Sequence, residues 1–269
     1  MAALSDLKNI LNFQIAHGRS PKFHLKVETG MTRLGVDMND IDQVIQLLSE
    51  HSELNCEGIY SHFATADEGD LSFALTQEAK FNTVLNLAKQ RHIQFKYTHI
   101  SNSGAVLNMD QSNYNVVRVG MLVYGAYPSE EVPRELDIKP VMTLIAPIVS
   151  IRRVPKGTPV SYGGVYRTNA NTNIGVVQCG FADGYPRNWY KDGYVYYQRN
   201  KYLIAGRICM DQFMVDFGDT APKLGDHILL IGENEHGIIS MEKVAKLIKS
   251  TPYVLSTAIG GRTERIFQD

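Results

Sequence analysis

One arginine stands inside an apolar stretch near the middle of the 269-residue chain. The stretch Val116–Gly125 reads VVRVGMLVYG, so Arg118 interrupts a β-branched run that otherwise predicts a buried strand. Taking a guanidinium out of water is costly unless fixed hydrogen-bond partners offset the loss. Arg118 is therefore either a structural residue paired with a buried carboxylate or a residue that faces a ligand.

Gly120 gives the second possibility a definite chemistry. Because glycine has no side chain, the backbone can approach a ligand closely, and free N–H groups there suit an anion such as phosphate. An arginine beside a phosphate-binding backbone segment is one way in which a protein binds pyridoxal phosphate, because Arg is a known partner of the pyridine nitrogen. On this stretch alone both interpretations of Arg118 stay open.

Three earlier segments also predict strands that end in polar side chains. They are Lys22–Val27, Cys56–Phe63 and Phe95–Ser101, and helical patterns lie between them, as in a parallel sheet of βα units. The polar residues at these ends are Lys26, Arg33, His62, His99, Ser101 and Ser103. In a barrel of such units, chemistry lies at the C-terminal ends of the strands. A lone histidine at such a position is more often a residue at the sheet edge whose hydrogen bonds are made within the protein. Together with the Arg118 segment, however, four predicted strands end in polar side chains on one edge, and this predicts a functional site.

The composition changes between Tyr127 and Pro140, where three prolines and four acidic residues indicate a domain boundary. We expect an α/β domain over residues 1–133 and a β-rich domain over residues 134–269, with short strands and glycine turns typical of a barrel or sandwich. A closed (β/α)₈ barrel needs eight units. The first domain offers about half that number, so it is predicted to be an open sheet or the C-terminal part of a TIM barrel.

Composition and charge exclude several classes of function. A net charge of −1 gives no electrostatic reason to expect nucleic acid or an anionic membrane as a partner. No apolar run reaches membrane-spanning length, and the first residues lack the pattern of a secretory signal. Cys56, Cys179 and Cys209 share no metal-ligand spacing, so we expect reduced thiols in a cytoplasmic protein and no metal site.

The second domain offers a tyrosine and a methionine near glycine turns. Tyr162 lies in the segment VSYGG, and Met210 follows Cys209 at the end of a strand predicted over Tyr202–Cys209. A tyrosine transfers protons only if its pKa is lowered or its proton is relayed, and a nearby His or Arg can do either. The alternative is a packing tyrosine whose hydroxyl binds the backbone.

Seven segments, in order and at matching intervals, resemble the signatures of bacterial alanine racemase. They are HLKVETGMTRLG (His24–Gly35), GIYSHFATAD (Gly58–Asp67), HISNSGA (His99–Ala105), VRVGMLVYG (Val117–Gly125), VSYGGVY (Val160–Tyr166), GFADGYPR (Gly180–Arg187) and GRICMDQ (Gly206–Gln212). The resemblance covers the chain from about Phe23 to its end. It implies a pyridoxal 5′-phosphate isomerase, a TIM barrel followed by a β domain, that works as a head-to-tail homodimer and supplies D-alanine for peptidoglycan.

The resemblance also implies which residues hold the cofactor. Arg118 would bond the pyridine nitrogen and keep it unprotonated, with His99 behind it and His62 linking it to Tyr162. The backbone N–H groups of two residues and one hydroxyl would hold the phosphate: Gly120, Met121 and Ser103.

Substrate residues follow from the same resemblance. Tyr162 of the partner subunit would be the base that handles the α-proton of L-alanine. Arg33 and the backbone at Met210 would hold the substrate carboxylate, with Lys26, carbamylated in many members, fixing Arg33.

Racemisation needs a base on each face of the substrate, and the second base is expected to be a lysine. In the family this lysine carries the cofactor and lies in a segment of the type VKANAYGHG. No lysine from Lys8 to Lys249 has such a context. We therefore expect that the chain begins well after the family's first βα units. Three hypotheses stay open: an alanine racemase whose activity as this chain alone is uncertain, a non-catalytic remnant or dimerisation partner, and a broader amino-acid racemase.

Overall fold

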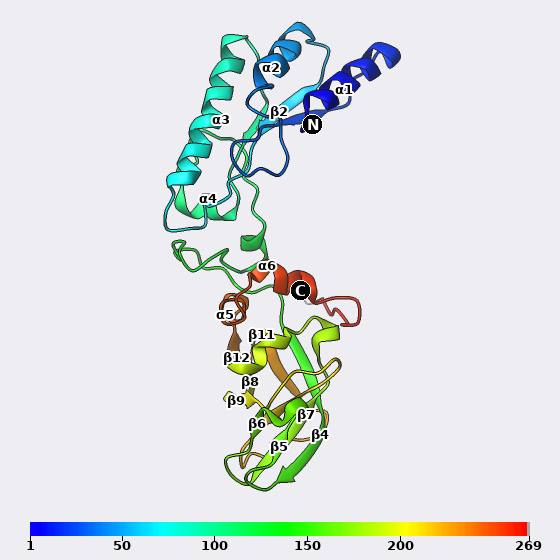
Figure 1. Cartoon of the computed structure of the whole chain (residues 1–269), viewed down its shortest axis with the longest axis vertical. Coiled ribbons are helices and arrows are strands. Elements are labelled where there is room, and N and C mark those ends of the chain that lie inside the picture. Colours follow the sequence, from blue (N-terminus) through cyan, green and yellow to red (C-terminus); the bar gives the residue numbers. More distant parts are fainter. Residues whose placement is uncertain (268–269) are drawn as a thin grey trace. The chain divides into compact units, whose positions relative to one another are not determined.

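The computed structural model describes residues 1–267 and divides the chain into two compact units (Figure 1). Unit 1 consists of Met1–Gly120 and Ser129–Glu135, and unit 2 consists of Met121–Pro128 and the chain from Leu136 onward. Each unit has its own apolar core. The division at residues 133 and 134 remains a prediction.

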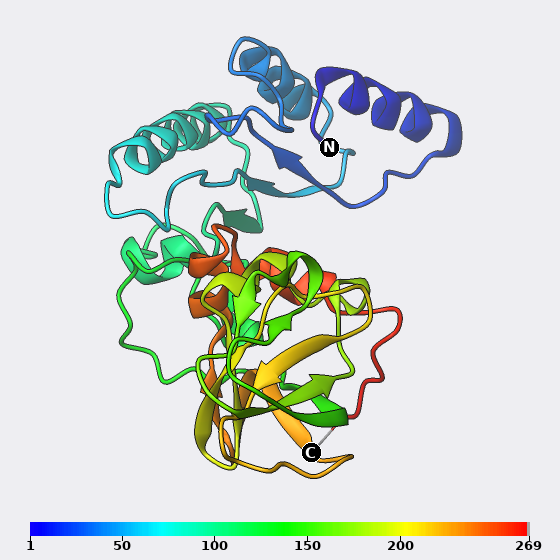
Figure 2. The ribbon, with the colours of Figure 1, turned by 60° about the horizontal axis from the view of Figure 1, so that its bottom comes forward.

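Unit 1 is a parallel sheet with helices, which confirms the predicted α/β class. The strands are β1 (Phe23–Lys26), β2 (Cys56–Tyr60) and β3 (Tyr97–His99), in the order β1–β2–β3. The helices are α1 (Leu4–His17), α2 (Ile41–Glu50), α3 (Ser72–Gln90) and α4 (Ser103–Asn108). Helices α1, α2 and α3 lie on one side of the strands (Figure 2).

Side chains alternate between the two faces of this sheet. Leu25 and Ile59 are fully buried in a core shared with Val44 of α2 and Phe81 of α3. Burying a side chain of this size stabilises the fold by about 1.5–3 kcal/mol, so the helix face fixes the register of the strands. The opposite face carries polar and aromatic side chains instead.

The predicted fourth strand over Val116–Val119 is wrong. Two backbone hydrogen bonds, from the N–H groups of Asn115 and Arg118, join this segment to carbonyl groups in and just after β3. These donors are three residues apart, whereas a regular ladder repeats every two residues. Val117 and Val119 are also 44% and 40% exposed, so the burial that would favour a β-branched strand is missing.

A closed ring of six strands forms most of unit 2, which confirms the predicted β-rich domain (Figure 2). The order is β11–β4–β7–β10–β9–β8, and the pairing of β8 with β11 closes the ring. The bounds are β4 (Leu144–Val154), β7 (Thr172–Val177), β8 (Tyr194–Tyr197), β9 (Asn200–Ile204), β10 (Phe213–Asp216) and β11 (His227–Asn234). Closure leaves no unpaired edge in the ring, and its interior buries side chains such as Phe213 and Leu229 completely.

Two strands predicted in unit 2 differ from the structure. The segment predicted as a strand over Val160–Tyr166 is a hairpin, because Gly163 and Gly164 have φ angles of 74° and 53° that a strand cannot adopt. Its parts are β5 (Pro159–Val160), the 3₁₀ turn η2 (Tyr162–Gly164) and β6 (Tyr166–Arg167). The strand predicted over Tyr202–Cys209 stops at Ile204, before Gly206 with its φ of 87°.

The remaining elements of unit 2 are short. They are η1 (Met121–Tyr124), η3 (Phe181–Asp183), η4 (Arg187–Lys191), β12 (Gly237–Ile239), α5 (Met241–Leu247) and α6 (Pro252–Ala258). Helix α6, which the pattern did not predict, begins at Pro252, and proline is favoured in the first turn because its missing N–H is not needed there. Across residues 1–267, no helix is both long and apolar enough to cross a membrane.

Candidate functional site

Two rows of side chains cross the helix-free face of the unit 1 sheet. Strand register aligns His24 with Gly58 and Tyr97 in one row. The next row consists of Lys26, Tyr60 and His99. The Tyr60 ring stacks on the His99 ring, with 4.9 Å between the ring centroids and an interplanar angle of 13°. This polar and aromatic face ends at the carboxyl edge of the strands, where the sequence predicted a site.

Arg118 makes the densest set of contacts at this edge. Its Nη1 donates to Nδ1 of His99 at 2.6 Å, and its Nη2 donates to Nδ1 of His62 at 2.9 Å. Nη2 also donates to the carbonyl oxygens of Ser61 and Ile100, at 2.7 and 3.2 Å. The guanidinium is therefore held from both sides in one orientation.

These contacts settle the protonation of both histidines. A guanidinium has donors only, so each Nδ1 must accept and each ring must be neutral with its proton on Nε2. Burial, and after it the positive charge of Arg118, lowers the pKa of His62 and of His99 to about 4. None of the hydrogen-bond partners of Arg118 within residues 1–267 is a carboxylate. The structural alternative of a buried Arg–carboxylate pair is thus excluded for the described part of the chain.

Lys26 lies beside this arginine on the same face. It is only 9% exposed, and its Nζ lies 5.7 Å from the centre of the Tyr60 ring. Burial, followed by the charges of Arg33 and Arg118, lowers its pKa. Two arginines and a buried lysine give this edge an excess of positive charge, which suits an anionic ligand.

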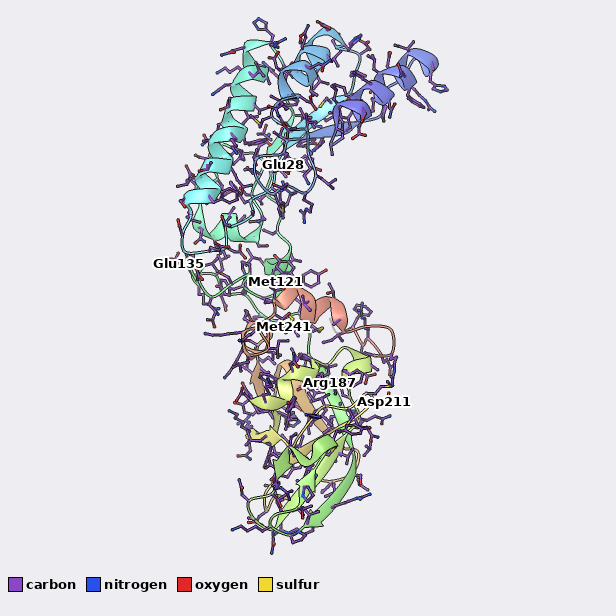
Figure 3. All side chains as sticks on the ribbon, in the orientation of Figure 1. Glu28, Met121, Glu135, Arg187, Asp211 and Met241 are labelled. Atoms are coloured by element: carbon purple, nitrogen blue, oxygen red, sulfur yellow. The ribbon has the colours of Figure 1, made fainter. Side chains whose placement is uncertain are left out.

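A carboxylate shapes the loop that carries Arg33. Glu28, labelled in Figure 3, accepts the backbone N–H groups of Gly30 at 2.6 Å and Arg33 at 3.2 Å. Burial alone would raise the pKa of Glu28, but hydrogen bonds from the loop backbone outweigh it and lower the pKa. The Arg33 side chain is exposed, so the loop presents it to solvent rather than to the core.

Ser103 and Gly120 lie together at the same edge. The Gly120 N–H donates to Oγ of Ser103 at 3.0 Å, and Ser103 is 1% exposed. A Cβ built on Gly120 would meet nothing within 4 Å, so the space over this backbone is open. Met121, labelled in Figure 3, begins η1 and belongs to unit 2.

A buried amide supports the His62 segment from the helix side. Gln77 of α3 is fully buried; its Oε1 accepts the N–H of Ala64 at 2.9 Å, and its Nε2 donates to the carbonyl of His62 at 3.1 Å. Nearby, the hydroxyls of Thr29 and Ser61 lie 2.7 Å apart. This network fixes the two loops that follow β1 and β2.

Tyr162 lies at the tip of the β5–β6 hairpin in unit 2 and is 67% exposed. Ser161 before it adopts a φ of 65°, and its Oγ donates to the carbonyl of Arg207 at 2.6 Å. A Cβ on Gly206 would come within 2.7 Å of the Ser161 side chain. The tyrosine is therefore presented by a strained, closely packed turn.

Met210 lies in a second loop of unit 2. Its carbonyl accepts the N–H of Ala182 at 3.0 Å. Arg262 forms ion pairs with Asp211 at 2.7 Å and with Asp183 at 3.3 Å, and Asp211 is labelled in Figure 3. Arg262 thus joins the loop of Met210 to the η3 loop.

The predicted site residues divide between the two units. Unit 1 brings together one group around a single edge: Lys26, Arg33, His62, His99, Ser103, Arg118 and Gly120. Unit 2 holds Met121, Tyr162 and Met210. Sequence reasoning missed the supports His24, Glu28, Tyr60 and Gln77. The alternation in β1 could have paired His24 with Lys26, but the register that places His24 over β2 is not visible in a single sequence.

Two family models match the chain. The N-terminal domain of alanine racemase matches residues 2–128, and the C-terminal domain of alanine racemase matches residues 141–267.

Individual relatives agree with these matches. The alanine racemase of Carboxydothermus hydrogenoformans is 40% identical over 91% of this chain, and that of Clostridium tetani is 37% identical over 97%. The chain spans about two thirds of the length of these relatives, 67% and 68% respectively.

Solved structures give the same result. The alanine racemase of Streptomyces lavendulae superposes with a TM-score of 0.92 at 32% identity, over all of this chain and 72% of that chain. The alanine racemase of Bartonella henselae, solved with covalently bound pyridoxal phosphate, gives a TM-score of 0.81 at 27% identity, over 96% of this chain and 70% of that chain.

Proposed function

The chain belongs to the alanine racemase family, whose members are isomerases that use pyridoxal 5′-phosphate, and on this premise we propose that its unit 1 edge holds that cofactor. The proposed reaction is the interconversion of L-alanine and D-alanine. The observation that carries the proposal is the Arg118 guanidinium, oriented by two neutral histidines and free of any carboxylate within the described residues. A cytoplasmic location, expected from the three unpaired cysteines, is part of the same proposal.

The residues of unit 1 fit the two ends of this cofactor. A pyridine nitrogen needs a donor, and a guanidinium has N–H donors only and donates while it keeps its proton. A phosphate needs polar donors beside an open backbone. Ser103 offers its O–H, because its Oγ accepts the Gly120 N–H and keeps its own proton, and a Cβ built on Gly120 would meet nothing within 4 Å. When bound, pyridoxal phosphate supplies an electron-withdrawing ring that acidifies the α-proton of an amino acid.

The protein's own groups then limit and direct the chemistry. Arg118 would leave the ring nitrogen unprotonated, which weakens electron withdrawal and favours rapid reprotonation of the substrate over side reactions. His62 accepts from Arg118 through Nδ1, and its Nε2–H, which has no acceptor among residues 1–267, can meet a second group. Arg33, with Lys26 beside it, would bind the alanine carboxylate.

The second proton-handling group is proposed to come from a second copy of the chain. Tyr162 is 67% exposed on a rigid turn, as expected of a side chain that functions in another subunit. We propose a homodimer in which Tyr162 of the partner subunit faces His62 and the Met210 backbone binds the substrate carboxylate. The lysine required on the other face of the substrate would have to come from outside these 269 residues, because none of their lysines has the family context.

Binding of pyridoxal 5′-phosphate to the full 269-residue chain tests the proposal directly. We expect saturable binding by absorbance and fluorescence, and at least tenfold weaker binding for Arg118→Met, because hydrogen bonds from a charged group are worth about 1.5–3 kcal/mol. Arg153→Met is the matched control. It removes the same charge from a half-exposed side chain that pairs with Asp219 on the surface of unit 2.

Catalysis is measured separately, by exchange of the alanine α-proton in D₂O with ¹H NMR. Exchange together with formation of D-alanine from L-alanine, read by chiral chromatography, would establish racemisation, and parallel assays with serine and lysine would define its breadth. Cofactor binding without exchange would identify a remnant or dimerisation partner. Binding that is absent, or equal for Arg118→Met and the wild type, would refute the proposed site.

A further inference from the structure

His24 reaches the Arg118 cluster from two strands away. Its Nδ1 lies 2.9 Å from Nε2 of His99, although His24 is on β1 and His99 is on β3. Neighbouring strands are about 4.8 Å apart, so a contact between β1 and β3 has to cross the backbone of β2. The His24 ring therefore lies over β2 rather than pointing straight away from the sheet.

Gly58 makes this crossing possible. It is the β2 residue aligned with His24, and a Cβ built on it would lie 2.8 Å from Nδ1 and Cε1 of the His24 ring. Real Cβ atoms do not approach so closely, and the nearest atoms belong to a stiff ring. Any side chain at this position would thus displace His24 from His99.

Aromatic neighbours hold the ring in this orientation. Tyr97 of β3 is aligned with Gly58, and its ring stacks against the His24 ring with 5.5 Å between the ring centroids and an interplanar angle of 25°. The Tyr60 ring meets it edge-on at 6.3 Å. The ring is thus fixed between strands rather than free to rotate in solvent.

The direction of the hydrogen bonds follows from Arg118. Because Arg118 donates to Nδ1 of His99, the His99 proton is on Nε2 and must find an acceptor. His99 is 6% exposed, so water cannot readily reach it to act as the acceptor. A buried N–H donor without an acceptor would destabilise the fold. Nδ1 of His24 is the acceptor that the structure provides, which places the proton of a neutral His24 on Nε2.

We propose that His24, lying over Gly58, is a positioning residue that fixes the His99 ring and thereby the orientation of the Arg118 guanidinium. The link to the cofactor ring rests on the proposed function, but the link from His24 to His99 does not. His24 therefore acts on binding through two intervening side chains, and it does not touch the ligand itself.

The first test uses ¹⁵N-histidine-labelled full chain without cofactor. We expect a slowly exchanging His99 Nε2–H resonance with scalar coupling across the hydrogen bond to Nδ1 of His24. In His24→Leu this resonance should be lost to exchange with water. In His24→Asn it should persist, because Oδ1 of asparagine offers an acceptor at the position of Nδ1. His17→Leu, which removes an exposed imidazole from α1, should leave the resonance unchanged.

Gly58→Ala tests the route over β2. It should abolish the same resonance by displacing His24 from His99. A His99 resonance that is unaffected by His24→Leu, or by Gly58→Ala, would overturn the proposal even if both variants remain folded.

The second test measures the dissociation constant of pyridoxal 5′-phosphate. His24→Leu should raise it about fivefold, the effect of loosening one buried hydrogen-bonded support, and His24→Asn should restore it to within about twofold of the wild type. If wild-type chain binds no cofactor while His24→Leu still removes the His99 resonance, the proposed function fails and the His24–His99 link stands. If His24→Leu removes the resonance but leaves a measurable affinity unchanged, the positioning role is refuted.

Discussion

Acid should selectively destabilise unit 1, because its two arginine-bound histidines must remain neutral to accept hydrogen bonds. The pKa of His62 and of His99 is about 4 in the folded chain, lowered first by burial and then by Arg118, against an ordinary value of 6.5. A lowered pKa means that the unfolded chain takes up protons first as the pH falls. The stabilisation is therefore complete above pH 6.5 and is lost progressively between pH 6.5 and 4.

The size of this loss can be worked out from the two pKa values. One unit of pKa corresponds to about 1.4 kcal/mol, so the full difference for His99, which is 6% exposed, is about 3 kcal/mol, of which about 2 kcal/mol is lost by pH 5. His62 is more exposed and solvent screens its interactions, so we assign it about half as much. Unit 1 should thus lose about 3 kcal/mol between pH 7 and pH 5, a large part of the 5–15 kcal/mol typical of a domain.

Urea unfolding followed by far-UV circular dichroism measures this loss, since the long helices α1 and α3 belong to unit 1. The midpoint should fall steadily from pH 7 through pH 6 to pH 5. The double variant His62→Asn, His99→Asn is the control and should show a much flatter dependence, because Glu28 and other carboxylates with a lowered pKa titrate below this range. A wild-type midpoint that is constant from pH 7 to 5, or a slope equal to that of the double variant, would refute the reasoning.

Three further predictions concern the supports of the site. Gln77→Leu should lower the free energy of unfolding by about 2–4 kcal/mol in urea titrations, because it leaves the partly buried Ala64 N–H and His62 carbonyl without partners; a loss below about 1 kcal/mol would show that the network is dispensable. Arg262→Met should barely change the free energy of unfolding, and still less at 1 M salt, because the Arg262 side chain in both ion pairs is half exposed; a large, salt-independent loss would contradict this. Cys179 should resist iodoacetamide at pH 8 in the native chain, since burial raises the pKa of its thiol to about 12; mass spectrometry showing rapid labelling of Cys179 would exclude that burial.

The sequence alone predicted the layers of the fold because they follow from short-range patterns. The segments predicted as strands, Lys22–Val27, Cys56–Phe63 and Phe95–Ser101, contain β1, β2 and β3, and helices α2 and α3 lie between them where helical patterns were recognised. The predicted strand at Val116–Val119 failed because a β-branched run predicts a strand only where neighbours bury it, and Val117 and Val119 remain exposed. Turn chemistry that needs positive φ at Gly163 interrupted another predicted strand.

The site was predictable in part for the same reason. Polar residues at strand ends indicated the edge where His62, His99 and Arg118 lie together, since parallel strands carry their carboxyl ends to one side. The contact between His24 and His99 depends on the register of three strands and on the absence of a side chain at Gly58. Those are long-range facts that no local pattern in one sequence contains.

The central claim is that Arg118 donates a hydrogen bond to the pyridine nitrogen of pyridoxal 5′-phosphate. The most direct measurement is the ¹⁵N chemical shift of ring-labelled pyridoxal 5′-phosphate bound to the full chain, with Arg118→Met for comparison. We predict the shift of an unprotonated, hydrogen-bonded nitrogen in the wild type, and a different shift with weaker binding in the variant. A protonated ring nitrogen in the wild type, or the same shift and affinity in both proteins, would contradict the claim.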